Sequence, residues 1–211
     1  MTTKLDIFSD PICPWCYIGK ARLEAALESR PDHPFLIEWH PFMLNPSMPR
    51  AGMDRLEYMQ AKFGDADGIL KAYLPIQEAA EAMGLPFHLD RIRRTPSTLD
   101  AHRLIHWAGL EGRQSAVVSA LFRAYFAEGR DIGDPAVLAE VAGAAGLDVA
   151  MTTRLLATDA DVQDIRERDA MIRERGLTGV PGFLIGRKYV LAGAQPPEVW
   201  TRLIDDLVAS A

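Results

Sequence analysis

The chain contains two cysteines, Cys13 and Cys16, separated by a proline and a tryptophan. A disulfide that closes so short a loop constrains little of the unfolded chain, which argues against a purely structural bond. A structural zinc site needs four ligands, and the nearest histidines, His33 and His40, lack the spacing of a second ligand pair. Two thiols separated by two residues can form and resolve a mixed disulfide. The pair therefore predicts redox chemistry without a bound metal.

The secondary structure expected around this pair is a strand, a turn and a helix. Residues 4–9 alternate in part between apolar and polar types, as a half-buried strand does, and Asp10-Pro11 ends that pattern. The helix predicted after the turn continues to about Ser29, and a second strand is predicted over residues 35–42. Strand, helix and strand in this order form a βαβ unit with the cysteines at its first turn.

This position gives the two thiols different roles. Cys13 is expected at the N-cap of the helix, Pro14 at its first position and Cys16 at its third. The Cys13 sulfur would then face the free amides of the first turn, and those donors together with the helix dipole favour the thiolate. We therefore expect Cys13 to be the nucleophile and the less exposed Cys16 to be the resolving thiol.

Residues 10–19, with the sequence Asp-Pro-Ile-Cys-Pro-Trp-Cys-Tyr-Ile-Gly, resemble the active-site segment of the DsbA-like thioredoxin-fold oxidoreductases. They are most similar to the cytoplasmic FrnE-type branch, which is related to the 2-hydroxychromene-2-carboxylate isomerases. Further segments resemble the same family in the expected order: Trp-His-Pro-Phe and Leu-Asn-Pro within residues 39–46, Leu-Asp-Ala-His-Arg-Leu at 99–104, Gly-Val-Pro at 179–181 and Gly-Ala-Gln-Pro at 193–196.

The resemblance implies an α/β, thioredoxin-like fold with a large all-helical insertion. Residues 1–53 and 165–211 would form the split thioredoxin-like domain, and residues 54–164 the helical insertion domain. The sequence pattern agrees with a helical insertion, because residues 54–175 contain no convincing strand and their predicted helices are separated by glycine-containing loops. The further elements predicted are helices over residues 56–63, 68–83, 97–107, 115–127, 135–145, 149–156 and 159–175, a hairpin over 183–191 and a terminal helix over 197–209.

The resemblance also implies a substrate-binding surface. Val180-Pro181 matches the family's cis-proline loop, which lies opposite the cysteine pair and offers its backbone to a substrate chain. We expect Val180 and Pro181 to bind substrate in this way, with Pro14 and an exposed Trp15 forming the neighbouring surface. Gly182 departs from the family pattern, since relatives often carry a bulkier residue there.

Several other side chains have both a functional and a structural interpretation. His102 and His106 have the spacing of a metal pair on a helix, but the glutamate of the metalloprotease motif is absent and packing is favoured. His40 could lie near the cysteines or serve as a hydrogen-bonded structural residue, and the second is favoured. Asp10 could accept a proton from Cys16, although a turn or capping role is preferred.

The composition and net charge of the chain limit the kinds of partner and the location that we expect for it. The chain has 211 residues, of which 48% are hydrophobic and 25% charged, which is ordinary for a globular protein of one domain or one domain with an insertion. A formal net charge of -6 argues against a nucleic-acid partner. The arginines in residues 166–175 alternate with acids, which predicts a helix face with many ion pairs and needs no function. No apolar run reaches about 18 residues and the start has no apolar segment, so we expect no membrane span, no secretory signal and a cytoplasmic location.

We therefore predict a thiol–disulfide oxidoreductase acting on thiol- or disulfide-bearing proteins or peptides, as a monomer or homodimer. It needs no tightly bound cofactor, because glutathione or another thiol can carry the electrons. The alternative is a glutathione-dependent isomerase or transferase of the 2-hydroxychromene-2-carboxylate isomerase type, in which serine usually stands at the position of Cys13. The presence of both Cys13 and Cys16 favours the oxidoreductase. A binding protein with a vestigial dithiol ranks last, because a decayed site need not have retained the rest of the motif.

Overall fold

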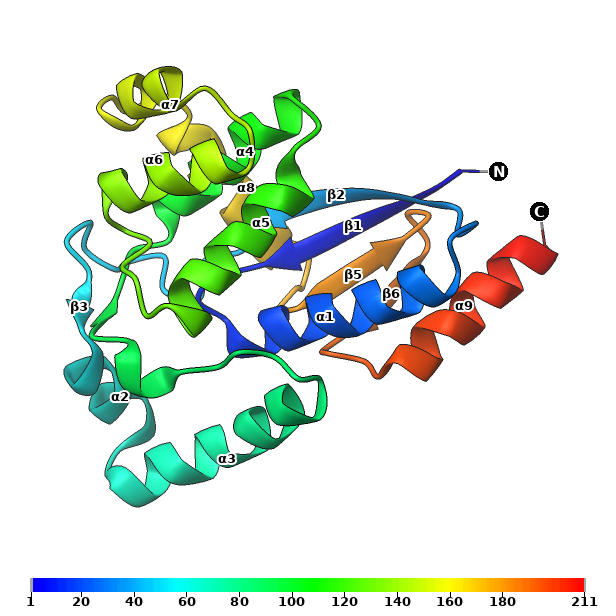
Figure 1. Ribbon diagram of the computed structural model, residues 1–211, viewed down its shortest axis with the longest axis horizontal. Coiled ribbons are helices and arrows are strands. Elements are labelled where there is room, and N and C mark those ends of the chain that lie inside the picture. Colours follow the sequence, from blue (N-terminus) through cyan, green and yellow to red (C-terminus); the bar gives the residue numbers. More distant parts are fainter. Residues whose placement is uncertain (1, 211) are drawn as a thin grey trace.

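A computed structural model describes residues 2–210, and its centre is a mixed four-stranded sheet in the order β2-β1-β5-β6 (Figure 1). Strand β1 (Thr3–Ser9) pairs in parallel with β2 (Phe35–Pro41) and antiparallel with β5 (Gly182–Ile185), which pairs antiparallel with β6 (Tyr189–Ala192). Segments from the two ends of the chain therefore share one sheet, and the β1–β5 pairing joins them.

The helices follow the predicted order. Helix α1 (Pro14–Ser29) connects β1 to β2, and α9 (Pro197–Ala209) follows β6. Every helix predicted from the sequence is present, with ends that differ by a few residues. Within residues 2–210, no helix combines the length and the apolar character needed to cross a membrane. The remaining helices are α2 (Arg55–Phe63), α3 (Ala66–Ala82), the 3-10 turn η1 (Leu89–Arg91), α4 (Leu99–Leu110), α5 (Gln114–Phe122), α6 (Pro135–Ala144), α7 (Val149–Leu156) and α8 (Val162–Glu174).

The two faces of the sheet are covered differently. Leu5 and Ile7 of β1 are buried on the face where α1 and α9 lie side by side (Figure 1). On the same face, the ring of Phe183 in β5 meets Trp200 of α9 edge-on, with 4.7 Å between ring centres. The alternate residues of β1 point to the opposite face, where α8 lies. This arrangement of β1, α1, β2, α8, β5, β6 and α9 is the thioredoxin-like part of the fold.

The insertion between β2 and α8 contains a short ladder that the sequence pattern did not predict. Met53–Asp54 (β3) and Arg94–Thr95 (β4) pair antiparallel, so the expectation of no strand in this region is wrong. Two residues on each side are too few to produce a visible alternation of apolar and polar types. The ladder ties the start of α2 to the segment that precedes α4.

One predicted helix ends early. The helix expected to continue to Ala127 ends as α5 at Phe122 and is followed by a π-helical turn, η2 (Arg123–Ala127). The aromatic side chains of Tyr125 and Phe126 in this turn are both buried. A regular helix places consecutive side chains about 100° apart around its axis, so two neighbours do not both point into the core. The wider π-helical turn allows both of these large side chains to enter it.

Helix α8 carries the ion pairs expected from its alternating arginines and acids, and one of its acids is buried. Asp169 is 3% exposed and forms an ion pair with Arg173 at 3.0 Å. The Arg173 guanidinium also lies over the ring of Phe42, 3.9 Å from its centre. The predicted ion pairs along the helix are therefore present, and Asp169 is buried because α8 packs against β2 and α4.

The insertion and the sheet share one hydrophobic core. A single cluster of buried side chains includes Leu5 and Phe183 of the sheet together with Leu104 of α4 and Leu138 of α6. The predicted boundaries at residues 53/54 and 164/165 therefore run through a continuous packed interior. They remain predictions that unfolding experiments can test.

Replacing Leu104 by alanine probes this continuity. Leu104 is fully buried, so Leu104→Ala should lower the free energy of unfolding by about 2–5 kcal/mol through lost contacts and the cavity left behind. We expect a single transition in which far-UV and near-UV circular dichroism coincide. The control Leu110→Ala lies at the end of the same helix, where Leu110 is 78% exposed, and should change the free energy by less than about 0.5 kcal/mol. Helical signal lost before the near-UV signal would contradict a shared core.

Candidate active site

The cysteine pair lies where the chain passes from β1 to α1. Cys13 is the N-cap of α1 with an extended backbone (φ -82°, ψ 115°), and Pro14 is the first helical residue, which makes Cys16 the third. The amides of Cys16 and Tyr17 donate to the carbonyl of Cys13 at 3.1 and 3.2 Å. The predicted placement of both thiols at the helix start is therefore confirmed. Pro14 has no N–H, so the amide of Trp15 is the one N–H of this first turn that is too near the helix start to have a partner within the helix.

The Cys13 sulfur makes a different contact from the one expected. Both cysteines are free thiols, and the Cys13 Sγ lies 3.6 Å from the carbonyl oxygen of Val180. It accepts no hydrogen bond from the amides of the first turn, so that expectation is wrong for the thiol form. The physical reason is that a thiol carries a proton and turns toward an acceptor, whereas an N–H···S bond uses the sulfur as the acceptor.

Cys16 is held in a less reactive state. Its side chain is 1% exposed, against 4% for Cys13. Burial raises the pKa of the Cys16 thiol well above its ordinary value, and the hydrogen bond and charge of the neighbouring Cys13 raise it further. A buried, protonated thiol does not attack a disulfide in solution.

The loop before β5 faces the cysteines. The Val180-Pro181 peptide bond is cis, as the resemblance implied. Gly193 donates its amide to the carbonyl of Pro181 at 2.8 Å, which ties the loop to the end of β6. A Cβ added to Gly19 of α1 would lie only 3.0 Å from the Cγ of Pro181, so the absence of a side chain allows helix and loop to approach. The structure thus brings Val180 and Pro181 to the dithiol.

Trp15 is less exposed than the sequence suggested. Its side chain is half-buried and packs against both the main core and a small cluster formed by Ile18, Ile76 and Ala80. Helix α3 lies beside α1 and covers part of the indole. The expectation of an exposed Trp15 is wrong because nothing in the local pattern places α3 there. Pro14, next to it, is also half-buried.

Gly182, the departure from the family pattern, has a local explanation. It is the first residue of β5 and pairs with Phe8 and with Ala192. A Cβ at this position would lie 2.9 Å from the Cδ1 of Leu177. The glycine therefore makes room for Leu177, and a bulkier residue would have to displace that side chain or the loop.

Asp10 anchors the loop that precedes the cysteines. Its carboxylate is fully buried and accepts hydrogen bonds from the amide of Ile12 at 3.3 Å and from the amide of Leu44 at 2.6 Å. Of the turn and capping roles, the structure therefore shows the turn role, because the carboxylate bonds the amide two residues on and no amide of α1. Burial raises the pKa of Asp10 to about 7, although these two amides act in the opposite direction.

Asp10 has a buried neighbour that sequence reasoning did not connect to it. The Nε2 of His102 on α4 lies 4.0 Å from the Asp10 Oδ1, and this nitrogen has no hydrogen-bond partner among residues 2–210. Burial lowers the pKa of His102 to about 4. No periodicity or motif relates the two positions, so only the packing of α4 against the loop shows the pair.

His40 and His106 both have structural roles. His106 bonds Arg168 through its Nδ1 at 3.1 Å, so it shares no site with His102, and the favoured packing interpretation agrees with this. His40 contacts Asp6 through its Nε2 at 2.6 Å. The hydrogen-bonded interpretation of His40 is therefore confirmed.

A dithiol at the start of the first helix, facing a cis-proline loop that leads into an antiparallel strand pair, defines a thioredoxin-like protein. The chain belongs to the DSBA-like thioredoxin domain family, whose model matches residues 4–205. It is 34% identical to a probable DsbA oxidoreductase from Streptomyces coelicolor, whose crystal structure superposes with a TM-score of 0.87 over 99% of this chain and 91% of that one. It is 31% identical to the uncharacterized protein YwbO of Bacillus subtilis, over 98% of each chain.

More distant structures share the fold. The cytosolic disulfide reductase DsbM from Pseudomonas aeruginosa, solved with GSH, has a TM-score of 0.70 at 21% identity over 98% of this chain and 99% of that one. A 2-hydroxychromene-2-carboxylate isomerase has a TM-score of 0.71 at 19% identity over 98% and 97%. The predicted DsbA-like thioredoxin fold and the resemblance to this family are confirmed.

The Asp10–His102 pair predicts opposing effects of pH on stability. The pKa of Asp10 is raised from 3.8 to about 7, so between these values the folded protein holds a proton that the unfolded chain releases, and stability falls as pH rises. The pKa of His102 is lowered from 6.5 to about 4, so the unfolded chain holds the extra proton in that window and stability rises with pH. Each slope is at most about 1.4 kcal/mol per pH unit, and in the natural protein the two oppose each other.

Single substitutions should separate the two slopes. In urea unfolding between pH 4 and 7, Asp10→Asn should make stability rise with pH, and His102→Gln should make it fall, relative to the unsubstituted protein. The double variant should return to the original, flatter profile. Profiles of both single variants that run parallel to the original would show that neither group titrates on unfolding as described.

Proposed function

We propose that this protein is a thiol–disulfide oxidoreductase of the FrnE-type branch, with Cys13 as the nucleophile and Cys16 as the resolving thiol. The observation that carries the proposal is the Cys13 sulfur, 3.6 Å from the carbonyl oxygen of Val180, the residue before the cis proline. A thiol at a helix start, opposite a backbone edge that can bind an extended chain, suits attack on a disulfide of a substrate protein. Membership of the DSBA-like family supports the same class of reaction.

The first step uses the start of α1. When Cys13 loses its proton, its sulfur becomes an acceptor, and the helix dipole stabilises the thiolate together with the amide of Trp15, which is too near the helix start to have a partner within the helix. The thiolate attacks one sulfur of a substrate disulfide, an S–S bond to Cys13 forms, and the other substrate sulfur leaves as a thiolate and takes up a proton. The thiol's bond to the Val180 carbonyl is lost at this stage, which frees that oxygen for a backbone N–H of the substrate.

Cys16 completes the exchange. Its buried position keeps the thiol protonated in the free protein. In the mixed disulfide, Cys16 loses its proton and attacks the Cys13 sulfur from the same helical turn, which releases the reduced substrate and leaves a Cys13–Cys16 disulfide. Two glutathione molecules then reduce this disulfide and become glutathione disulfide. The same steps in reverse oxidise a substrate dithiol.

One relative of the same fold supports the partners and the location. DsbM of Pseudomonas aeruginosa is a cytosolic disulfide reductase, and its structure contains GSH. We propose the cytoplasm as the location here, glutathione as the thiol that exchanges electrons with the dithiol, and thiol- or disulfide-bearing proteins or peptides as substrates. Pro14 and Trp15, both half-buried, would contact the bound chain together with Val180 and Pro181.

Single-cysteine variants test the two roles. Cys13→Ser should lower the rate of insulin reduction by glutathione at least about a hundredfold, because the attacking thiol is lost. Cys16→Ser should form a mixed disulfide with substrate that persists and is visible by mass spectrometry, because no second thiol resolves it. The double variant is the control for non-enzymatic exchange. Activity of Cys13→Ser near that of the unsubstituted protein would refute the proposal.

The variant Cys16→Ala distinguishes the oxidoreductase from a glutathione-dependent isomerase. That enzyme class would bind glutathione and turn over a chromene carboxylic acid, and its activity would survive Cys16→Ala. Loss of disulfide exchange in Cys16→Ala, with no turnover of the chromene acid in any variant, supports the oxidoreductase.

The reduction potential of the dithiol decides the direction of exchange. It can be measured in glutathione buffers by tryptophan fluorescence, since Trp15 lies between the cysteines. A value near or below the cytosolic glutathione poise assigns a reductase, and a value far above it assigns an oxidant or isomerase.

Gly19→Val should separate α1 from the proline loop. A Cβ there meets the Pro181 Cγ at 3.0 Å and the Ala194 Cα at 3.4 Å, so a branched side chain must displace the loop from the nucleophile. We expect the rate of insulin reduction to fall about tenfold or more, because small displacements of reacting groups are costly. Glu28→Val, on an exposed position of the same helix, controls for the effect of a branched residue on helix stability. Equal rates for the two variants would contradict a role for this contact.

A further inference from the structure

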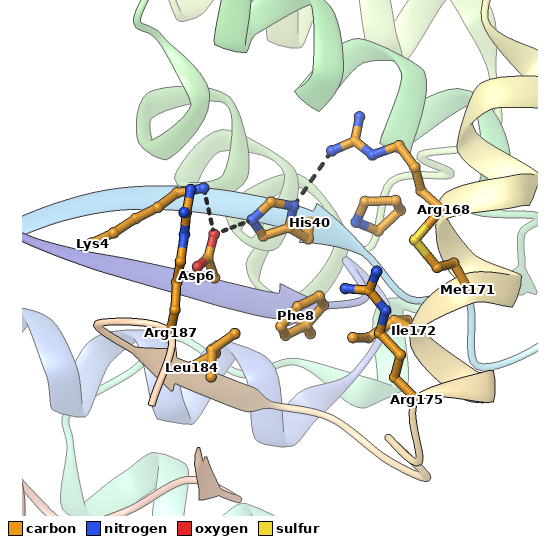
Figure 2. Close-up of a pocket in the computed structure, with 11 residues that line it drawn as sticks. Lys4, Asp6, Phe8, His40, Arg168, Met171, Ile172, Arg175, Leu184 and Arg187 are labelled. Atoms are coloured by element: carbon orange, nitrogen blue, oxygen red, sulfur yellow. Dashed lines mark hydrogen bonds and ion pairs between the residues drawn. The ribbon is translucent and has the colours of Figure 1, made fainter. Parts of the chain in front are cut away.

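A cavity of about 440 Å³ opens on the face of the sheet opposite α1 and α9 (Figure 2). Phe8 of β1 and Leu184 of β5 form its apolar floor, and Met171 and Ile172 of α8 form one wall. The cysteines are not among the residues that line it. Its size falls in the range of sites that hold small organic molecules, and it is separate from the proposed reaction site.

Cations from three elements converge on this cavity. Figure 2 shows Arg168 and Arg175 reaching in from the side of α8, and Arg187 and Lys4 on the other side. Arg168 already bonds His106 at 3.1 Å and lies 3.4 Å from Asp164. By contrast, the guanidinium groups of Arg175 and Arg187 have no hydrogen bond or ion pair within the described residues 2–210. These two arginines are available to a ligand.

The pairing of the acidic side chains near the cavity indicates which class of ligand it can bind. Asp6, Glu38 and His40 have ligand atoms within 4.8 Å of one another, the grouping expected of a metal site. The Lys4 ammonium already lies between the two carboxylates, 2.9 Å from Asp6 and 2.7 Å from Glu38. A metal ion there would have to displace that charge. The remaining unpaired charge of the cavity is positive, which favours an anion.

The backbone at Arg187 gives a second, independent indication. Arg187 has a φ of 61° and follows Gly186 with a φ of 57°, in the three-residue loop between β5 and β6. These two residues are the central positions of a turn that the amide of Lys188 closes by donating to the carbonyl of Ile185 at 3.0 Å. Such a turn favours glycine, asparagine or aspartate at both positions, because left-handed backbone is unfavourable for a long side chain. Arginine at this place is therefore not explained by the turn, and its side chain reaches the cavity.

We propose that this cavity binds a small organic carboxylate with an aromatic or branched apolar body. The guanidinium group of Arg187 would hold the carboxylate, since arginine matches its planar geometry with paired N–H donors, and Arg175 on the opposite side of the cavity would add to the positive potential that attracts it. The apolar body would lie on Phe8 and Leu184. Phe8 is itself held in place by stacking on His40, with 5.1 Å between ring centres.

Calorimetric titration with benzoate, phenylacetate and 4-phenylbutyrate tests this site. At least one of the three should bind saturably with a Kd below about 10 mM. The uncharged amide of that compound should bind at least tenfold more weakly, because it cannot form the charged pairs. Arg175→Gln and Arg187→Gly should each weaken binding of the carboxylate at least tenfold.

Two controls make the result specific. Arg187→Gly relieves the left-handed backbone, so its melting temperature should be unchanged or higher, and weaker binding then does not reflect unfolding. Arg154→Gln, at an exposed arginine of α7, and Cys13→Ser should both bind as the unsubstituted protein does. The proposal is overturned if none of the three carboxylates binds, if the amide binds equally well, or if Cys13→Ser rather than the arginine variants abolishes binding.

Discussion

The structure depends on the close approach of the cis-proline loop to the first turns of α1. Gly19 has no side chain, so Pro181 can lie against the helix, and the Cys13 thiol can donate to the carbonyl of Val180. The loop leads directly into β5, which pairs with β1, the strand that ends before the cysteines. The loop that faces the dithiol is therefore continuous with the central pairing of the sheet.

Buried polar groups extend this constraint to the helical insertion. Asp10 holds the loop before Cys13, and its neighbour His102 belongs to α4 of the insertion. Asp169 of α8 accepts a hydrogen bond from the amide of Met43 at 2.7 Å, and so fixes the chain that leaves β2. Buried charges and unpaired polar atoms cost free energy unless their partners are well placed. An arrangement that separated these groups would leave them buried without partners, so they favour the observed position of α4 and α8 relative to the dithiol.

Local interactions explain how much could be predicted from the sequence. The strand, the break at Asp10-Pro11 and the helix that starts at Pro14 depend on residues only a few positions apart, so composition and periodicity were sufficient. The place of Val180-Pro181 opposite the dithiol came from resemblance to a family and not from any local pattern. The β3–β4 ladder was missed because two residues carry no period, and Trp15 was expected to be exposed because α3 is distant in sequence.

Interactions between residues near in sequence are enough to predict the order of the elements and the helix start at the cysteines, and they led to the proposed chemistry of the site. The contacts between distant segments became visible in the folded chain alone: the Cys13 thiol with the Val180 carbonyl, Asp10 with His102, and Arg187 with the cavity on the other face of the sheet. The physical reason is that propensity and capping act along a few residues of chain. Burial, hydrogen-bond partners and the pKa of buried groups depend instead on segments that folding brings together from distant parts of the sequence.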